Sequence, residues 1–166
     1  MRLMGLILLI LAGGGCGCLW AARLKKRAGI LETAVCWVQY LQTEFRFRMT
    51  PLTAALEACA GQPAFRELTF LTAAATYPGA PTEGLVTALR QQARTLALTP
   101  SDTELLTQLC MGLGTTDLEG QLRHLELYAA RLELQQTEAL EQYRRKGRVC
   151  RVLGVGASAA VALVLW

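Results

Sequence analysis

The chain has 166 residues, of which 52% are hydrophobic and 18% are charged, and its formal net charge is +4 at pH 7. The net positive charge arises from the two ends. Residues 28–143 hold all 13 acidic residues but only seven of the 17 Lys/Arg residues, which gives this central region a net charge of −6. Nucleic-acid binding requires a basic face on the folded part of a protein, so this charge distribution argues against it.

The first apolar segment, from Leu3 to Ala22, contains no charged residue. About 20 apolar residues in a helix cross a hydrocarbon core of about 30 Å, so we predict a transmembrane helix over residues 1–22. A cleaved signal peptide and a lipoprotein signal at Cys16 are the alternatives. Gly13 replaces the aliphatic residue that a lipoprotein signal usually has. Four cations follow this segment at once and act as a stop-transfer signal: Arg23, Lys25, Lys26 and Arg27.

The second apolar segment covers residues 152–166 and also lacks charge. Its fifteen residues would rise only about 22 Å as a helix, less than a full membrane span. Arg148 and Arg151 can extend their charged groups outward, and Trp166 is suited to the far interface. The alternative is a buried core helix. The charges beside both segments favour a second transmembrane helix.

Ten Lys/Arg residues flank the two apolar segments, and nine of them lie on the side of the central region. Because cytoplasmic flanks are enriched in Lys/Arg, both termini are expected outside and residues 23–151 in the cytoplasm. These basic collars also suit anionic lipid headgroups. A reducing cytoplasm disfavours disulfides. The ten cations are Arg2, Arg23, Lys25, Lys26, Arg27, Arg144, Arg145, Lys146, Arg148 and Arg151.

Helical periodicity organises the central region, and no alternating strand pattern is present. The first helix is expected to continue from Arg23 to about Met49. Thr50 would cap the next helix, with Pro51 at its first position and Gly61 at its end. Further helices are expected over residues 63–75, 84–97 and 100–111, with a loop from Tyr77 to Gly84. The seam of the first helix is Leu31, Ala34, Val38, Leu41 and Phe45.

The longest helix is expected over residues 117–166, a rod of about 75 Å. Gly112 and Gly114 break the chain before it, and Thr116 with Glu119 forms a potential capping box. The two long helices should pack antiparallel. The predicted fold is therefore all-α, a membrane-anchored antiparallel helical bundle. The seam of the last helix is Leu118, Leu122, Leu125, Ala129, Leu132, Gln136, Ala139 and Tyr143.

No constellation of residues predicts catalysis, a cofactor site or a metal site. His124 is the only histidine, and the six cysteines lack the paired C-x-x-C spacing of a zinc site. The glycines of "GGGCG" lack the Gly-Lys-Ser/Thr of a phosphate loop. We therefore expect a protein that is not an enzyme and binds no cofactor. Gly13 and Gly17 form a step that allows close helix approach in a bilayer. Association with further copies of the chain, as a homo-oligomer, is an open alternative.

Three stretches of the chain carry a family resemblance. The first joins Glu44 to the turn at Thr50, Pro51 and Leu52. The second and most specific is the Leu-Gly-x-x-Asp-x-x-x-Gln pattern formed by Leu113, Gly114, Asp117 and Gln121. The third is the step from Leu153 to Gly154. In these features and their order the chain resembles stage III sporulation protein AB of endospore-forming bacteria. Residues 62–81 cannot be matched to the family.

That resemblance implies a helical cytoplasmic domain anchored in the mother-cell membrane around the forespore. The family is similar to the inner-membrane platform protein F of type II secretion and type IV pilus systems. The implied role is a platform in the channel-like complex between mother cell and forespore. Its implied partners are other stage III A proteins, including the AA protein, a secretion-type ATPase. The alternative is a generic small membrane adaptor or a toxin-like membrane protein.

An ATPase that approaches from the cytoplasm would first meet the end of the domain farthest from the membrane. We expect that end to hold the Thr50–Pro51 turn, the Tyr77–Gly84 loop and the Thr99–Gly114 segment. Opposite charges on exposed surfaces mainly accelerate association. The predicted acidic partner face consists of Glu83, Asp102 and Glu104.

Overall fold

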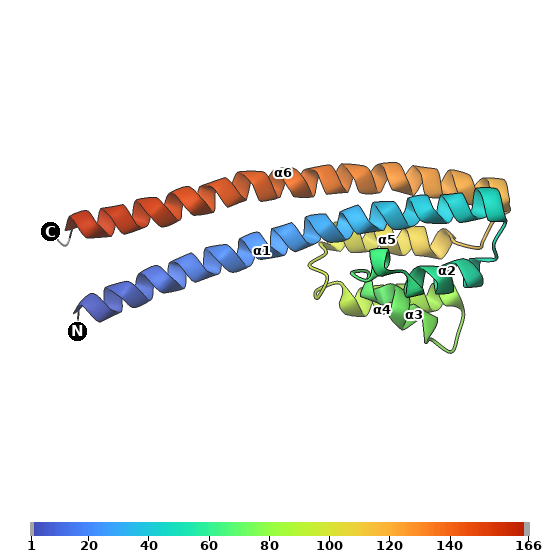
Figure 1. Cartoon of the computed structure of the whole chain (residues 1–166), viewed down its shortest axis with the longest axis horizontal. Coiled ribbons are helices and arrows are strands. Elements are labelled where there is room, and N and C mark those ends of the chain that lie inside the picture. The colour runs from blue at the N-terminus through green and yellow to red at the C-terminus, as the bar shows by residue number, and fades with distance from the viewer. Residues whose placement is uncertain (1, 165–166) are drawn as a thin grey trace.

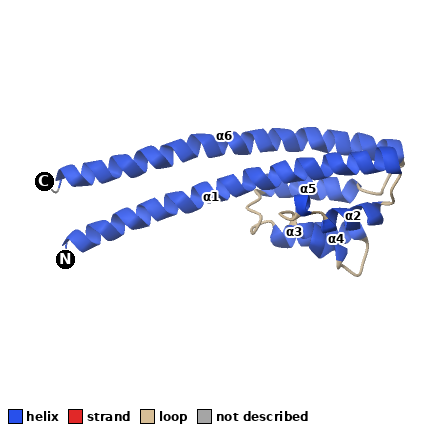
Figure 2. Ribbon diagram, in the orientation of Figure 1, coloured by secondary structure: helices blue, strands red, loops and turns tan. Residues whose placement is uncertain are grey.

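The computed structural model describes the backbone of residues 2–164 and the side chains of residues 21–145. Every regular element in the described backbone is a helix (Figure 2), which confirms the predicted all-α class. Two long helices, α1 and α6, form an extended pair, and shorter helices cover part of one side (Figure 1). The α-helices are α1 (Arg2–Thr43), α2 (Leu52–Gly61), α3 (Thr69–Ala75), α4 (Pro81–Gln92), α5 (Pro100–Gly112) and α6 (Leu118–Val164).

The long helices α1 and α6 run antiparallel, so that α1 begins where α6 ends (Figure 1). The predicted seam of the first helix is confirmed, because all five of its residues are buried. On α6, Leu125, Leu132 and Ala139 are fully buried, as the heptad spacing predicted. Leu122, Gln136 and Tyr143 are half-buried, and Leu118 is the one exposed residue of this seam, with 42% of its surface accessible. It lies in the first turn of α6, at the end of the pair opposite the termini.

The short helices differ from the predicted ones at several boundaries. The expected helix over residues 63–75 is divided into a 3₁₀ turn (Pro63–Phe65) and α3, because Leu68 has a non-helical ψ of 67° between them. Helix α4 begins at Pro81 and not at Gly84, since proline is favoured at a first helical position. It ends at Gln92, short of Ala97, which has a φ of +57°.

The core extends over both sides of α1, where this helix meets α6 and where it meets the short helices. Trp37 of α1 is fully buried and its ring contacts Phe70 of α3 edge to face, with centroids 5.8 Å apart. Tyr40 contacts Phe65 in a similar geometry at 5.6 Å. Edge-to-face aromatic pairs contribute about 0.5–1.5 kcal/mol beyond the area they bury. Helix α1 therefore carries two apolar faces, one for α6 and one for the short helices.

Among the residues whose side chains the structure describes, no helix is long and apolar enough to cross a membrane. The predicted transmembrane segments 1–22 and 152–166 lie outside those residues, apart from Ala21 and Ala22. Leu153 and Gly154 also lie outside them. Membrane anchoring therefore stays a prediction.

Candidate functional site at the tip of the helix pair

The end of the helix pair opposite the termini is formed by residues 44–52 and 112–121, and we call this end the tip. Here α1 widens into a π-helix, Glu44–Arg48, which ends at Met49 with a left-handed φ of 49°. Short π-helical turns are rare, and those that occur are frequently found at functional sites. The segment presents two large apolar side chains to solvent, because Phe47 is 77% exposed and Met49 is 74% exposed.

Glu44 ties this segment together from the inside. Its side chain is buried, accepts a hydrogen bond from the Thr50 hydroxyl at 3.1 Å, and forms an ion pair with Arg48 at 3.3 Å. The prediction that Thr50 caps α2 is wrong, since Pro51 is the N-cap residue and no side chain caps the helix. The extended ψ of 145° at Pro51 delays the helix by one residue, and Thr50 bonds back to Glu44 instead.

The turn between α5 and α6 supplies the second half of the tip. Gly114 has a φ of +78°, a conformation that glycine adopts without the penalty of a Cβ atom. Asp117 caps α6, because its Oδ1 accepts a hydrogen bond from the backbone N–H of Gly120 at 3.2 Å. The predicted Thr116–Glu119 capping box is therefore wrong. Glu119 instead forms an exposed ion pair with Arg123 at 2.8 Å.

The two halves meet in a groove of about 290 Å³. A Cβ atom at Gly114 would lie 3.0 Å from Cδ2 of Leu52, which shows how closely they approach. Leu113, beside this contact, is buried. The fold thus gathers two motifs that are about 60 residues apart in the chain. The groove is lined by Phe45, Met49, Thr50, Pro51, Leu52, Thr116, Leu118 and Gln121.

Sequence reasoning found the polar and turn residues of the tip but missed its exposed apolar side chains. Phe47 and Met49 belong to the run "EFRFRM", in which apolar residues alternate with arginines. That alternation departs from the helical period of the preceding seam, and it was the available signal. Arg46 pairs with Glu126 of α6 at 3.1 Å, so the π-helix is also tied to the second long helix.

Two buried thiols of the described part are poor nucleophiles. Burial raises the pKa of Cys59 to about 11 and that of Cys110 to about 12, so both stay protonated at neutral pH. The ring of His124 lies 3.1 Å from the carbonyl oxygen of Leu109 and packs against Tyr128, a structural arrangement. Within residues 21–145 no cluster of His, Cys, Asp and Glu has the geometry of a metal site.

The predicted acidic partner face requires a correction at Asp102. Its side chain is fully buried and forms two hydrogen bonds with Arg27, from Nε at 2.7 Å and from Nη2 at 2.9 Å. Asp102 therefore cannot present charge to a partner. Only Glu83 and Glu104 of the predicted face are exposed.

The same ion pair corrects the placement of the Thr99–Gly114 segment. Arg27 belongs to the N-terminal collar, so the start of α5 lies at the collar end of the domain and only its last residues reach the tip. Arg27 is itself buried, unlike Arg23, Lys25 and Lys26. Thr99 and Asp102 form a reciprocal capping box that begins α5 beside Arg27.

The sequence of the chain, including the tip, was compared with known protein families. The family model described as stage III sporulation protein AB matches residues 2–166. Searches of curated proteins and of solved structures returned no match. The matched range includes both halves of the tip and both collars. The chain therefore belongs to the stage III sporulation protein AB family.

Proposed function

We propose that the protein is a non-enzymatic platform component of the stage III sporulation complex between mother cell and forespore, and that its tip docks a secretion-type ATPase. In this proposal the apolar segments 1–22 and 152–166 anchor it in the mother-cell membrane, and the domain faces the cytoplasm. Family membership supports the sporulation role. The other stage III A proteins, including the AA ATPase, are the proposed partners.

The observation that carries the docking site is the grouping of both family motifs around one groove with exposed apolar side chains. Isolated apolar residues on a surface are ordinary, but a grouped set beside a groove is typical of an interaction site. Met49 and Leu118 line the groove, and Phe47 lies two residues before Met49 in the adjoining π-helix; each of the three is at least 42% exposed. The tip is also the end of the domain farthest from the two termini (Figure 1).

The side chains of the tip define the kind of partner surface that would fit it. Apolar side chains of the partner would fill the groove beside Gln121, whose amide can donate and accept a hydrogen bond at the rim. Arg48 is 73% exposed although it pairs with Glu44, so its guanidinium can also reach a partner carboxylate. Aromatic residues, methionine and arginine are enriched in protein–protein interfaces relative to the rest of the surface.

The test compares ATPase capture by the purified full chain with capture by a Phe47→Ser, Met49→Ser double variant. We expect capture to fall at least tenfold, because both side chains would otherwise be buried against the partner. The melting temperature should stay unchanged, since exposed substitutions usually alter stability by less than about 0.5 kcal/mol. Leu134→Ser is the matched control, because Leu134 is 68% exposed on α6 away from the tip. Equal loss in the control, or full capture by the double variant, would remove the tip as the docking site.

A further inference from the structure

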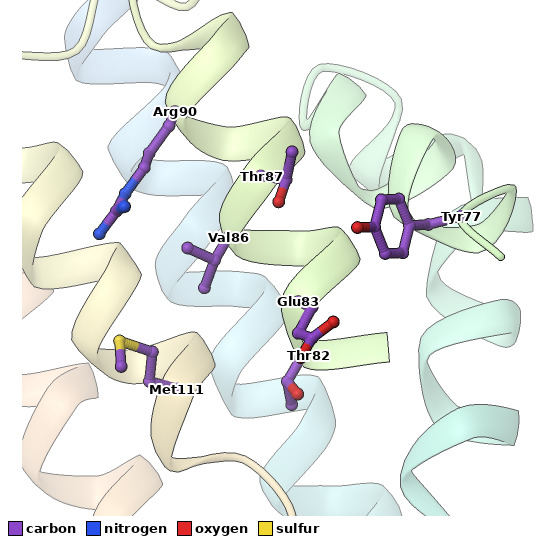
Figure 3. A pocket seen from close by; sticks show the side chains of 7 residues that line it. All are labelled: Tyr77, Thr82, Glu83, Val86, Thr87, Arg90 and Met111. Atoms are coloured by element: carbon purple, nitrogen blue, oxygen red, sulfur yellow. The ribbon is translucent and has the colours of Figure 1, made fainter. Parts of the chain in front are cut away.

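A second groove lies outside the tip, on the outer surface of the short helices. It has a volume of about 420 Å³ and runs along α4, between Met111 of α5 and Tyr77 of the α3–α4 turn (Figure 3). Helix α4 contributes residues that recur three and four apart along one face, as a helix surface requires. These are Glu83, Val86, Thr87 and Arg90, and Thr82 completes the lining.

The Tyr77 side of this groove is preformed. A Cβ atom at Gly79 would lie 2.7 Å from Cε1 of Tyr77, and one at Gly84 would lie 2.8 Å from its Cβ. The missing side chain at Gly84 lets the Cβ of Tyr77 approach the start of α4, and the missing side chain at Gly79 leaves room for the ring in its present position. A wall that is already in place reduces the ordering cost of binding.

The groove has one acidic and one basic side chain, at opposite ends of its α4 face. Glu83 and Arg90 stand seven residues apart on α4, about 10.5 Å along the helix axis. Neither side chain forms an ion pair or a hydrogen bond with any other described side chain. Val86 lies between them, and Met111, which is 60% exposed, faces the same space. The groove thus offers an acid, an apolar centre and a base in series.

We propose that this groove receives one helix of a different protein. That helix carries a cation opposite Glu83 and a carboxylate opposite Arg90, about two turns apart, with an apolar side chain between them for Val86 and Met111. A helix fits because the lining residues follow one helix face, and a helix packed alongside repeats at the same spacing. A small molecule fits poorly, since such ligands are mostly enclosed, whereas Tyr77 and Met111 are 41% and 60% exposed. The proposal is independent of ATPase docking at the tip.

A second copy of this chain is the competing occupant. Helix α6 exposes its own cation, leucine and carboxylate in series at Arg131, Leu134 and Glu138. However, Gln135 donates a hydrogen bond to Ser101, which places this series level with the start of α5. Met111 lies ten residues farther along α5, about 15 Å away. Two copies standing side by side at equal height therefore do not bring the series to the groove.

Site-specific photocrosslinking in sporulating cells tests the proposal with the full chain. Benzoylphenylalanine replaces Thr87 in the groove, Leu134 on α6, or Glu57 on α2 as the exposed control. We expect position 87 alone to give a product with one different protein. The crosslinked peptide should carry Lys or Arg and Asp or Glu about seven residues apart. Combining Glu83→Lys with Arg90→Glu should reduce that product at least tenfold without changing the melting temperature.

Three outcomes would overturn the proposal. They are no product at position 87, a product with a second copy of this chain, or a product whose yield is unaffected by the charge exchange. A second copy crosslinked at both positions 87 and 134 would assign the groove to self-association instead. These outcomes do not affect the test of ATPase capture by the tip, because Phe47 and Met49 are not part of this groove.

Discussion

Asp102 and Arg27 show how one residue pair joins distant parts of the chain. They are 75 residues apart in the sequence, and their two hydrogen bonds connect α5 to α1 in a buried setting. Arg27 also donates to Gln142 at 3.2 Å and to Gln135 at 3.3 Å, so α6 takes part. The hydrogen bonds that Arg27 donates to Asp102 raise the pKa of Arg27, and the guanidinium stays charged at any relevant pH. Three helices thus meet at one ion pair.

Removing one partner of this pair should be strongly destabilising. Asp102→Ala leaves the Arg27 guanidinium buried without its counter-charge, which typically costs about 3–5 kcal/mol of unfolding free energy. The double variant Arg27→Met, Asp102→Leu should recover most of that loss, because no buried charge remains. Denaturant unfolding followed by circular dichroism measures both. A double variant as unstable as Asp102→Ala would show that the pair has a role beyond mutual charge compensation.

The same pair predicts a pH dependence of stability. Burial alone would raise the pKa of Asp102, but hydrogen bonds from Arg27 and from the backbone of Thr99 outweigh it and lower the pKa below its ordinary value. The stabilisation is therefore complete above the unfolded pKa, about 3.9, and is lost as pH falls through the folded pKa. The stability difference between the wild type and Asp102→Asn should shrink below about pH 4. Parallel unfolding profiles between pH 5 and pH 2 would contradict this assignment.

At the scale of elements, the approach of α5 to α6 depends on a glycine. A Cβ atom at Gly112 would lie 2.2 Å from Cε1 of His124, whose ring also contacts the carbonyl oxygen of Leu109. The ring cannot withdraw without losing that contact and its packing on Tyr128. The end of α5 is thereby set against α6 beside the turn that forms the tip.

Gly112→Ala should therefore lower the unfolding free energy by about 1–3 kcal/mol, the usual cost of overpacking. Adding His124→Ala should recover part of the loss, because the clashing ring is removed. Gly61→Ala is the matched control, since no atom lies within 4 Å of a Cβ placed there. Thermal unfolding of Gly112→Ala, of the double variant with His124→Ala and of Gly61→Ala measures these differences in stability. Equal stability of Gly112→Ala and Gly61→Ala would mean that α5 can shift without cost.

At the scale of the whole molecule, the antiparallel pair brings the start of α1 and the end of α6 to the same end (Figure 1). That arrangement is what two membrane segments flanking one domain require. The exposed cations where the two apolar segments join the domain are Arg23, Lys25, Lys26, Arg144 and Arg145. Such collars favour a cytoplasmic position beside anionic headgroups.

Topology reporters test this arrangement directly. A fusion after Trp166 should report an extracytoplasmic position, and an insertion in the turn between Tyr77 and Ala80 should report a cytoplasmic one, because nine of the ten flanking cations lie on the domain side. The insertion site is exposed, so the fold should tolerate it. Detection of both reporters on the same side would exclude the two-span arrangement.

The sequence by itself determined the features that depend on neighbours along the chain. Spacings of three and four identified the buried seams of α1 and α6, and Thr99 with Pro100 marked the start of α5. These signals are local because helices form from bonds between residues four apart. The family motifs also located the tip residues, although their common groove was not foreseen.

Only the tertiary structure decided which distant residues meet. It turned Asp102 from a predicted surface acid into the buried partner of Arg27, and it moved the start of α5 to the collar end. It also replaced the expected caps at Thr50 and Thr116 with Pro51 and Asp117. Spacing along a helix marks which face is apolar, but which helix covers that face and which charges pair depend on packing between distant segments. The alternation in "EFRFRM" was a local signal for the exposed apolar groups at the tip, but only packing of the two long helices placed them beside the turn before α6.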